Sequence, residues 1–131
     1  MSTLNVDALV GNTSANAITV RGEGSATTSL QQGLAKSWVN FDGTGTPASR
    51  DSLNNSSITD SSTGNFTSNF TTNMANDDYS AMVGTGSTGA TNRNSSVDGM
   101  ATSSISLQTY NVSNSNVDHE FTFCNAHGDL S

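Results

Sequence analysis

The stretch "GNFTSNFTTNM", from Gly64 to Met74, spaces Phe66, Phe70 and Met74 four residues apart among Thr, Ser and Asn. Both a helix and a strand would place these three side chains on one face. A helix is disfavoured because Thr is stiff at χ1, and because Ser and Asn compete for backbone hydrogen bonds. On a strand, every residue of the opposite face is polar. The pattern therefore predicts a half-buried antiparallel strand over residues 65–74.

The same alternation recurs along the chain and predicts a series of short strands. In "AKSWVNF", Ala35, Ser37, Val39 and Phe41 share one face. The further predicted strands cover residues 4–10, 18–20, 53–58, 79–84, 104–113 and 117–125. Residues 85–100 show no period and are predicted to form a long loop.

Two of these strands have a distinctive parity. In residues 104–113, Ile105 and Leu107 share one parity and Tyr110 has the other, which predicts a β-bulge near positions 108 and 109. In the last strand, one face is expected to carry Val117, His119, Phe121 and Phe123, and the other Asp118, Glu120 and Thr122.

The segment "RGEGSATTS" interrupts the alternation with two glycines and small polar residues. We therefore expect an N-terminal arm, residues 1–30, and a knob, residues 31–131. No segment makes a convincing helix. The predicted fold is an all-β, antiparallel, jelly-roll-like β-sandwich with a short N-terminal β arm.

Composition leaves two interpretations open. Leu, Ile, Val and Phe account for only 23 of 131 residues, whereas Ser, Thr and Asn account for 56. Such a chain is either a disordered polar linker or a turn-rich β protein, and the clean alternation favours the second. A core this lean predicts an obligate oligomer, expected to be a homotrimer, with surface from Phe66, Phe70 and Met74 or from Trp38 packed between subunits.

The charge balance excludes one class of binding partner. Four Lys and Arg against 11 Asp and Glu give a net charge of −7, which argues against nucleic-acid binding. No apolar run is long enough to insert into a membrane. The start "MSTLNVDALV" shows no signal peptide. A single cysteine, Cys124, permits no disulfide within the chain and fits synthesis in a reducing cytoplasm.

Candidate chemistry is sparse, and we expect no catalytic, cofactor or metal site. His119, Cys124 and His127 are possible metal ligands, but an extended chain would hold the two histidines roughly 26 Å apart. A core-facing His119 and a solvated His127 are expected instead. A glycan-cleaving enzyme would need two carboxylates at roughly 5–10 Å, and the sequence shows no such pair. The protein is therefore not expected to be an enzyme.

Three segments together resemble a module at the C-terminal ends of phage tail-fibre and fibre-like proteins, especially of phages of marine and cyanobacterial hosts. They are "AKSWVNFDGTG" (35–45), "DSLNNSSITD" (51–60) and "NFTT" (69–72), with "HGDLS" (127–131) similar to the usual ending. Ser37 and Asp42 depart from the more usual Ala and Asn. The start "MSTLNVDALV" is similar to virion-attachment segments.

The resemblance implies a trimeric virion structural protein without catalytic activity. Its N-terminal arm would attach to other virion proteins through the alternating residues Leu4, Val6, Ala8 and Val10. Its knob would contact a host-surface receptor such as a glycan. The chain is short for a tail fibre, so a capsid decoration, cement or head-fibre protein remains the alternative.

A simple model of strands that run up and down predicts which residues would face the receptor. If each strand reverses direction in turn from the arm, the distal tip gathers Asp42, Asn76, Asp77, Asp78, Tyr79 and Asn114. These are acceptor-rich groups beside one aromatic ring, which suits sugar hydroxyls, although turn chemistry accounts for them about as well. A crossover spanning the sandwich would invert the later assignments.

Overall fold

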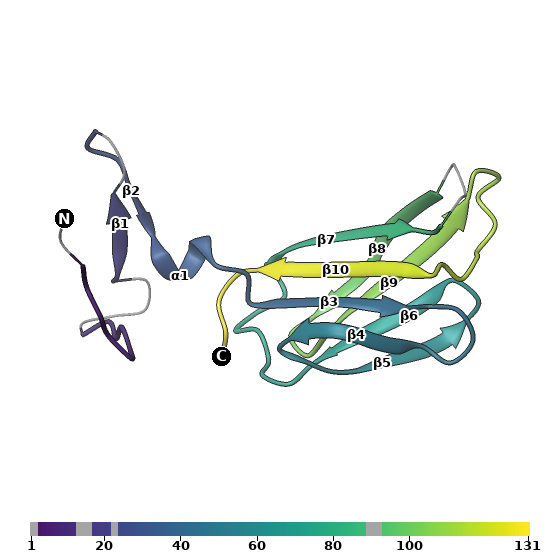
Figure 1. Cartoon of the computed structure of the whole chain (residues 1–131), viewed down its shortest axis with the longest axis horizontal. Helices are drawn as coiled ribbons and strands as arrows, with labels where there is room; N and C mark the ends of the chain where they lie inside the picture. The colour runs from purple at the N-terminus through teal and green to yellow at the C-terminus, as the bar shows by residue number, and fades with distance from the viewer. Residues whose placement is uncertain (1–2, 13–16, 22–23, 89–92) are drawn as a thin grey trace. The chain divides into compact units, whose positions relative to one another are not determined.

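The computed structural model describes residues 3–12, 17–21, 24–88 and 93–131. The chain divides into two compact units, Met1–Leu34 and Ala35–Ser131. The second unit is an all-β antiparallel sandwich of two four-stranded sheets (Figure 1). The predicted fold class is thereby confirmed. The division lies four residues after the predicted boundary, because a short helix, α1 (Leu30–Gly33), stays with the first unit.

Each sheet of the sandwich has four strands. Sheet I has the order β4-β3-β10-β7, and its strands are β3 (Ser37–Asp42), β4 (Ala48–Leu53), β7 (Ser80–Gly86) and β10 (Phe121–His127). Sheet II has the order β5-β6-β9-β8, and its strands are β5 (Asn55–Ser62), β6 (Asn65–Phe70), β8 (Arg93–Ala101) and β9 (Ser104–Asn111). The last strand, β10, thus lies beside the first strand of the sandwich, β3.

The core lies between the inward faces of the two sheets. Val39 and Phe41 of β3 face Phe66 and Phe70 of β6, and all four are buried, as the alternation predicts. Phe41 and Phe66 meet edge to face with ring centroids 5.3 Å apart. The predicted strand over 65–74 ends at Phe70, but Met74 is still buried because the chain bends back and pairs with Leu130.

The burial of these side chains corrects the prediction that they pack between subunits. Phe66 is 1%, Phe70 6% and Met74 1% exposed within a single chain. They fill the sandwich and present no surface to another subunit. Of the side chains named for that contact, only Trp38 lies on an outer face.

Every turn of the sandwich lies at one of its two ends. The chain enters β3 at one of them, which we call the entry end, and we call the opposite end the far end. At the entry end, the Lys36 N–H donates to the Ala126 carbonyl at 2.8 Å. At the far end, Gly43 donates to the His119 carbonyl and Gly64 accepts from Thr109.

A reversal at Asn54 separates two strands that the sequence pattern joins. Residues 53–58 were expected to be one strand, but β4 ends at Leu53 in sheet I and β5 begins at Asn55 in sheet II. Asn54 has a φ of 53°, which Asn tolerates better than most residues. Its side-chain amide makes two hydrogen bonds to the Thr72 backbone. Asn54 Oδ1 accepts from the Thr72 N–H at 2.7 Å, and Asn54 Nδ2 donates to the Thr72 carbonyl at 3.0 Å.

The prediction of a long loop over residues 85–100 is wrong at both of its ends. Thr85 and Gly86 belong to β7, and residues 93–100 belong to β8 (Arg93–Ala101). Positions 89–92 lie outside the described residues. The strand is polar and carries a bulge between Val97 and Gly99, so it shows no clean period. The bulge predicted near Gln108 is absent from β9. Instead Thr109 takes the buried position after Leu107, and its hydroxyl donates to the Val117 carbonyl.

The parity predicted for the last strand is inverted. Thr122, Cys124 and Ala126 are buried, whereas Phe121 and Phe123 point outward. The strand begins at Phe121, after a bend in which the Thr122 hydroxyl bonds the His119 carbonyl. Small inward side chains are required there because Phe41, Phe66 and their neighbours already fill the core.

The first unit is less regular than predicted. Residues 4–10, expected to be a strand, form none. The predicted strand over 18–20 corresponds to β1 (Thr19–Arg21), which pairs with β2 (Thr27–Ser29). Helix α1 follows, and the Ser29 side chain caps it by accepting from the Gln32 N–H at 3.4 Å.

Cys124 provides a direct test of the observed parity of β10. The side chain is 2% exposed, and burial raises the pKa of its thiol. We expect the native protein to react with a disulfide reagent at least roughly 100-fold more slowly than the protein in guanidinium chloride, because only the exposed thiolate attacks. Absorbance of the released thiolate measures the rate. Rapid reaction of the native protein would contradict an inward-facing Cys124.

Two glycines with the same backbone conformation test the close packing at the far end. Gly64 (φ 69°) and Gly45 (φ 67°) both have a positive φ, which favours glycine over other residues. Only at position 64 would a Cβ meet other atoms, the nearest being the Thr109 carbonyl oxygen at 2.5 Å. We expect Gly45→Ala to lower the free energy of unfolding by about 1 kcal/mol. Gly64→Ala should lower it by roughly 3 kcal/mol or more. Urea denaturation measures both, and equal losses would contradict the packing described.

Candidate binding surfaces

The six residues predicted to form a receptor-facing tip do not lie together. Asp42 and Asn114 are at the far end, Asp42 as the last residue of β3 and Asn114 in the turn after β9. Asn76, Asp77, Asp78 and Tyr79 lie at the entry end, in the segment that bonds the C-terminal residues. The simple model lacks two strands that the structure has. Because the chain reverses at Asn54, every strand from β5 to β7 runs in the direction opposite to the one predicted. The unpredicted strand β8 reverses the chain once more, so β9 and Asn114 return to the predicted direction and end.

Two of these six residues are occupied by contacts within the sandwich. The Tyr79 ring is buried against Phe70, and its hydroxyl lies 3.0 Å from the Ala101 carbonyl and 2.9 Å from that of Ser104. Asp42 accepts from the Thr44 hydroxyl and backbone N–H, and these bonds, with the charge of Arg50, lower the pKa of its carboxyl. The Tyr79 side chain is therefore buried away from any receptor, whereas the Asp42 side chain is still 31% exposed.

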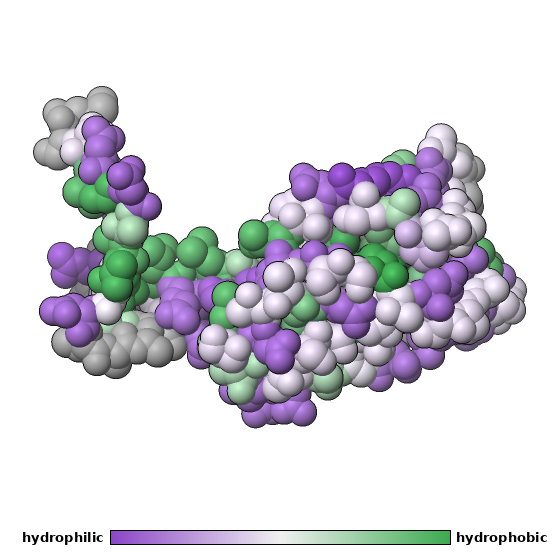
Figure 2. Space-filling model, turned by 90° about the horizontal axis from the view of Figure 1, so that it is seen from below, coloured by the Kyte–Doolittle hydropathy of each residue, from purple (hydrophilic) through white to green (hydrophobic). Residues whose placement is uncertain are grey.

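The predicted attachment residues are exposed, although they form no strand. Leu4 is 77%, Val6 55% and Val10 82% exposed, and Ala8 is also exposed. Figure 2 shows hydrophobic side chains at the surface of this N-terminal unit, whereas pale and polar residues cover most of the visible side of the sandwich. Such a run of exposed apolar residues marks a surface that another molecule can cover.

His119 faces the core, as expected from the sequence, and His127 is exposed. The His119 ring lies 2.6 Å from Arg93 Nη1 and 3.1 Å from the Tyr110 carbonyl. These contacts give the buried imidazole a structural role at the far end.

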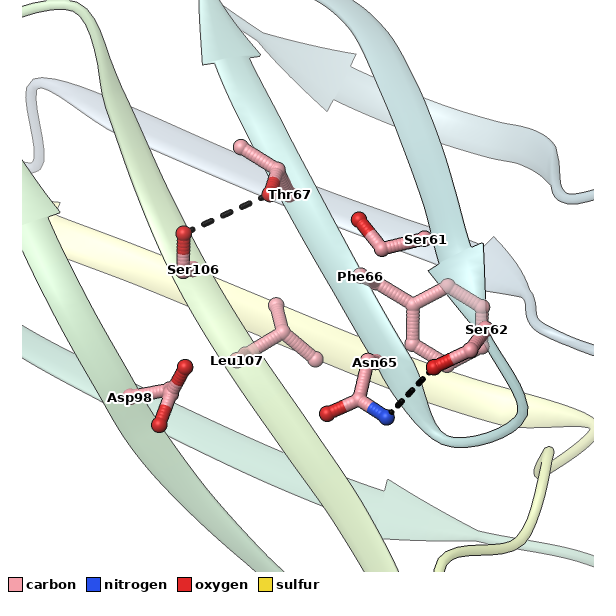
Figure 3. Close-up of a pocket in the computed structure, with 8 residues that line it drawn as sticks. All are labelled: Ser61, Ser62, Asn65, Phe66, Thr67, Asp98, Ser106 and Leu107. Carbon is pink, nitrogen blue, oxygen red and sulfur yellow. Dashed lines mark hydrogen bonds between the residues drawn. The ribbon is translucent and has the colours of Figure 1, made fainter.

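A polar groove lies on the outer face of sheet II, with a volume of about 320 Å³ (Figure 3). Its sides come from the edge strands β5 and β8, and its floor from the central strands β6 and β9. The lining residues are Ser61, Ser62, Asn65, Phe66, Thr67, Asp98, Ser106 and Leu107. Phe66 and Leu107 turn their side chains into the core, so the groove presents chiefly hydroxyl, amide and carboxylate groups.

Two β-bulges at the same level of the sheet shape this groove. In β5 the register shifts between Asp60 and Ser62, which makes Ser61 the extra residue. In β8 it shifts between Val97 and Gly99, which makes Asp98 the extra residue. Phe66 pairs with Leu107 between them. A bulge redirects a side chain and bends its strand, so both edges turn an extra polar residue toward the groove.

Several groove atoms are available to a ligand. The Asp98 carboxylate and the Ser61 hydroxyl have no hydrogen-bond partner among the described residues. Thr67 and Ser106 hydroxyls pair with each other at 3.3 Å, and Asn65 Nδ2 donates to Ser62 at 2.9 Å. Sequence reasoning missed Asp98 because it placed the residue in a loop. Only the pairing of β8 with β9 reveals its position.

The outer face of sheet I is different, because it carries large apolar side chains. Leu53, Trp38, Phe121, Phe123 and Met82 lie on this face, which we call the apolar face. Met82 is 67% and Phe123 47% exposed. The Phe123 ring occupies the space over Gly84, where a Cβ would lie 2.3 Å from a ring carbon.

Polar groups also lie on the apolar face, between the large apolar side chains. The Arg50 guanidinium lies 4.6 Å from the centre of the Phe121 ring and also pairs with Asp42 at 3.0 Å. Asn40 and Asn125 stand among the apolar side chains, and their Oδ1 atoms are buried without a hydrogen-bond partner among the described residues. Unpaired buried acceptors cost free energy, which a donor from water or from another molecule would recover.

Comparisons with protein-family models, with curated proteins and with solved structures found no match. Within the described residues, no helix has the length and hydrophobicity needed to cross a membrane. The same residues contain no cluster of three or more His, Cys, Asp or Glu side chains able to hold a metal ion.

Proposed function

We propose that the chain is a structural and adhesive protein of a phage particle, a tail fibre or fibre-like appendage. The observation that carries the proposal is the exposed apolar segment around Leu4, Val6 and Val10, which belongs to a unit separate from the sandwich. The resemblance of residues 35–72 to a fibre module supports the same assignment. In this proposal, the N-terminal unit attaches to other virion proteins and the sandwich contacts a receptor on the host surface.

The apolar face supports an oligomeric form of the sandwich. Trp, Phe, Met and Arg are the side chains enriched at the centres of protein interfaces. Here Trp38, Phe123, Met82 and Arg50 share one face of sheet I. In the proposed oligomer, expected to be a trimer, copies of the chain cover this face and remove its apolar area from water.

The attachment segment can be tested on intact particles. We expect the full-length variant with Leu4→Ser, Val6→Ser and Val10→Ser to fold normally but to be incorporated into particles at less than about a tenth of the wild-type level, because the apolar contact area is lost. Quantitative immunoblotting of purified particles measures incorporation. The matched control is Val112→Ser, which removes an equally exposed apolar side chain from a far-end turn.

Location on the particle separates the two candidate roles. Gold labels at the tail support the fibre assignment, whereas labels over the head surface would favour a capsid decoration protein. Normal incorporation of the triple variant would refute attachment through this segment. Absence of the wild-type protein from particles would refute the virion assignment itself.

The apolar face can be tested by charge insertion. We expect Met82→Glu to shift the wild-type oligomer toward monomers at micromolar concentration, because it would bury an unpaired carboxylate between subunits. Light scattering coupled to size exclusion measures the mass. Val112→Glu adds the same charge at another exposed site and should leave the mass unchanged. A wild-type protein that is a stably folded monomer would contradict the proposed oligomer.

A further inference from the structure

The groove of sheet II has a composition and a shape that point to one class of ligand. Its lining offers hydroxyls from Ser61, Thr67 and Ser106, the amide oxygen of Asn65 and one carboxylate, Asp98. Hydroxyls both donate and accept, whereas a carboxylate only accepts. This set matches the hydroxyl groups of a sugar, each of which also donates and accepts.

We propose that this groove binds a saccharide of the host surface, with Asp98 and Ser61 holding it from opposite sides. The inference rests on the proposed adhesive function and names the site that performs it. A volume of about 320 Å³ lies at the lower end of the range for small-ligand sites, which suits a short saccharide segment.

The polarity of the lining argues against other occupants. An apolar peptide side chain would remove the Asp98 carboxylate and the groove hydroxyls from water without giving them partners, which is costly. An anionic ligand would meet the negative charge of Asp98 at close range. A neutral saccharide instead donates hydroxyl protons to the carboxylate, and charge-assisted hydrogen bonds of this kind are stronger than neutral ones.

The arrangement is a built feature of the sheet. Ser61 and Asp98 are both extra residues of bulges, and the bulges occur on the two edge strands at the level where Phe66 pairs with Leu107. The bulges insert Ser61 and Asp98 as extra residues beside this level of β6 and β9, and they bend the two edge strands there. The buried Phe66 and Leu107 fix the floor beneath the ligand.

The test measures binding of the purified full-length protein to cells of the bacterial strain that the particle infects. Cells are used untreated and after sodium periodate, which cleaves the vicinal diols of sugars. We expect wild-type binding to untreated cells and its loss after periodate. Asp98→Asn should weaken binding about tenfold, because it replaces a charged acceptor with a neutral amide of the same shape.

Matched controls separate the groove from the rest of the surface. Asp77→Asn makes the same change at an exposed position of the entry end and should bind like the wild type. Ser61→Leu places a larger side chain at the groove edge and should weaken binding at least as much as Asp98→Asn. Ser113→Leu, in an exposed turn, should not.

The outcomes distinguish this proposal from the function on which it rests. If the wild type binds and both groove variants bind equally well, the groove is not the site. If binding survives periodate, the receptor does not present a sugar with vicinal diols, and the saccharide proposal fails in that form. If the wild type binds no host cells, the adhesive function itself is wrong, and the groove proposal fails with it.

Discussion

The edge-to-face contact between Phe41 and Phe66 joins the two sheets, and the rest of the sandwich is arranged around it. The rings come from β3 and β6, lie 5.3 Å apart and are almost fully buried. Aromatic side chains bury large areas, so two such rings supply much of the apolar contact in a chain with few large aliphatic residues. Because this space is full, β10 presents only Thr122, Cys124 and Ala126 to the core.

The filled core determines the character of both outer faces. Phe121 and Phe123 cannot enter it, and they lie instead over Gly86 and Gly84 of β7. This places two large aromatic rings on the outside of sheet I, near Trp38 and Met82. On sheet II, the outward-facing side chains of β6 and β9 that line the groove are polar. The bulges on β5 and β8 add Ser61 and Asp98 to this polar face. The two faces therefore differ in chemistry, and the partners proposed for them differ accordingly: a copy of the chain for sheet I and a polar ligand for sheet II.

Sequence patterns predict the elements whose two faces differ sharply in polarity. β3 and β6 are of this kind, and their inward residues follow from alternation alone. The same reasoning fails at Asn54, because a one-residue reversal carries no signal beyond two adjacent asparagines. It fails at β8, where hydrogen bonding to β9 rather than side-chain pattern makes the strand. It fails at β10, because small residues face inward and large ones outward.

The candidate sites also divide into those that the sequence pattern predicts and those that depend on the folded structure. Leu4, Val6, Ala8 and Val10, which the sequence suggests for attachment, are exposed, and their role in attachment stays a prediction. The receptor-facing set depended on counting reversals, so one missed turn moved Asn76–Tyr79 to the opposite end. The groove could not be predicted, because Ser61 and Asp98 meet only through the register of four strands.

The central claim is that the apolar face of sheet I is covered in the assembled protein. The most direct measurement compares oxidation of Met82 and Met100 by hydroxyl radicals in one sample of the wild-type protein. In a single chain Met82 is 67% and Met100 42% exposed, so Met82 should be oxidised faster if the face is open. The account predicts the reverse order, with Met82 protected and Met100 reactive. Faster oxidation of Met82 in the assembled protein would contradict it.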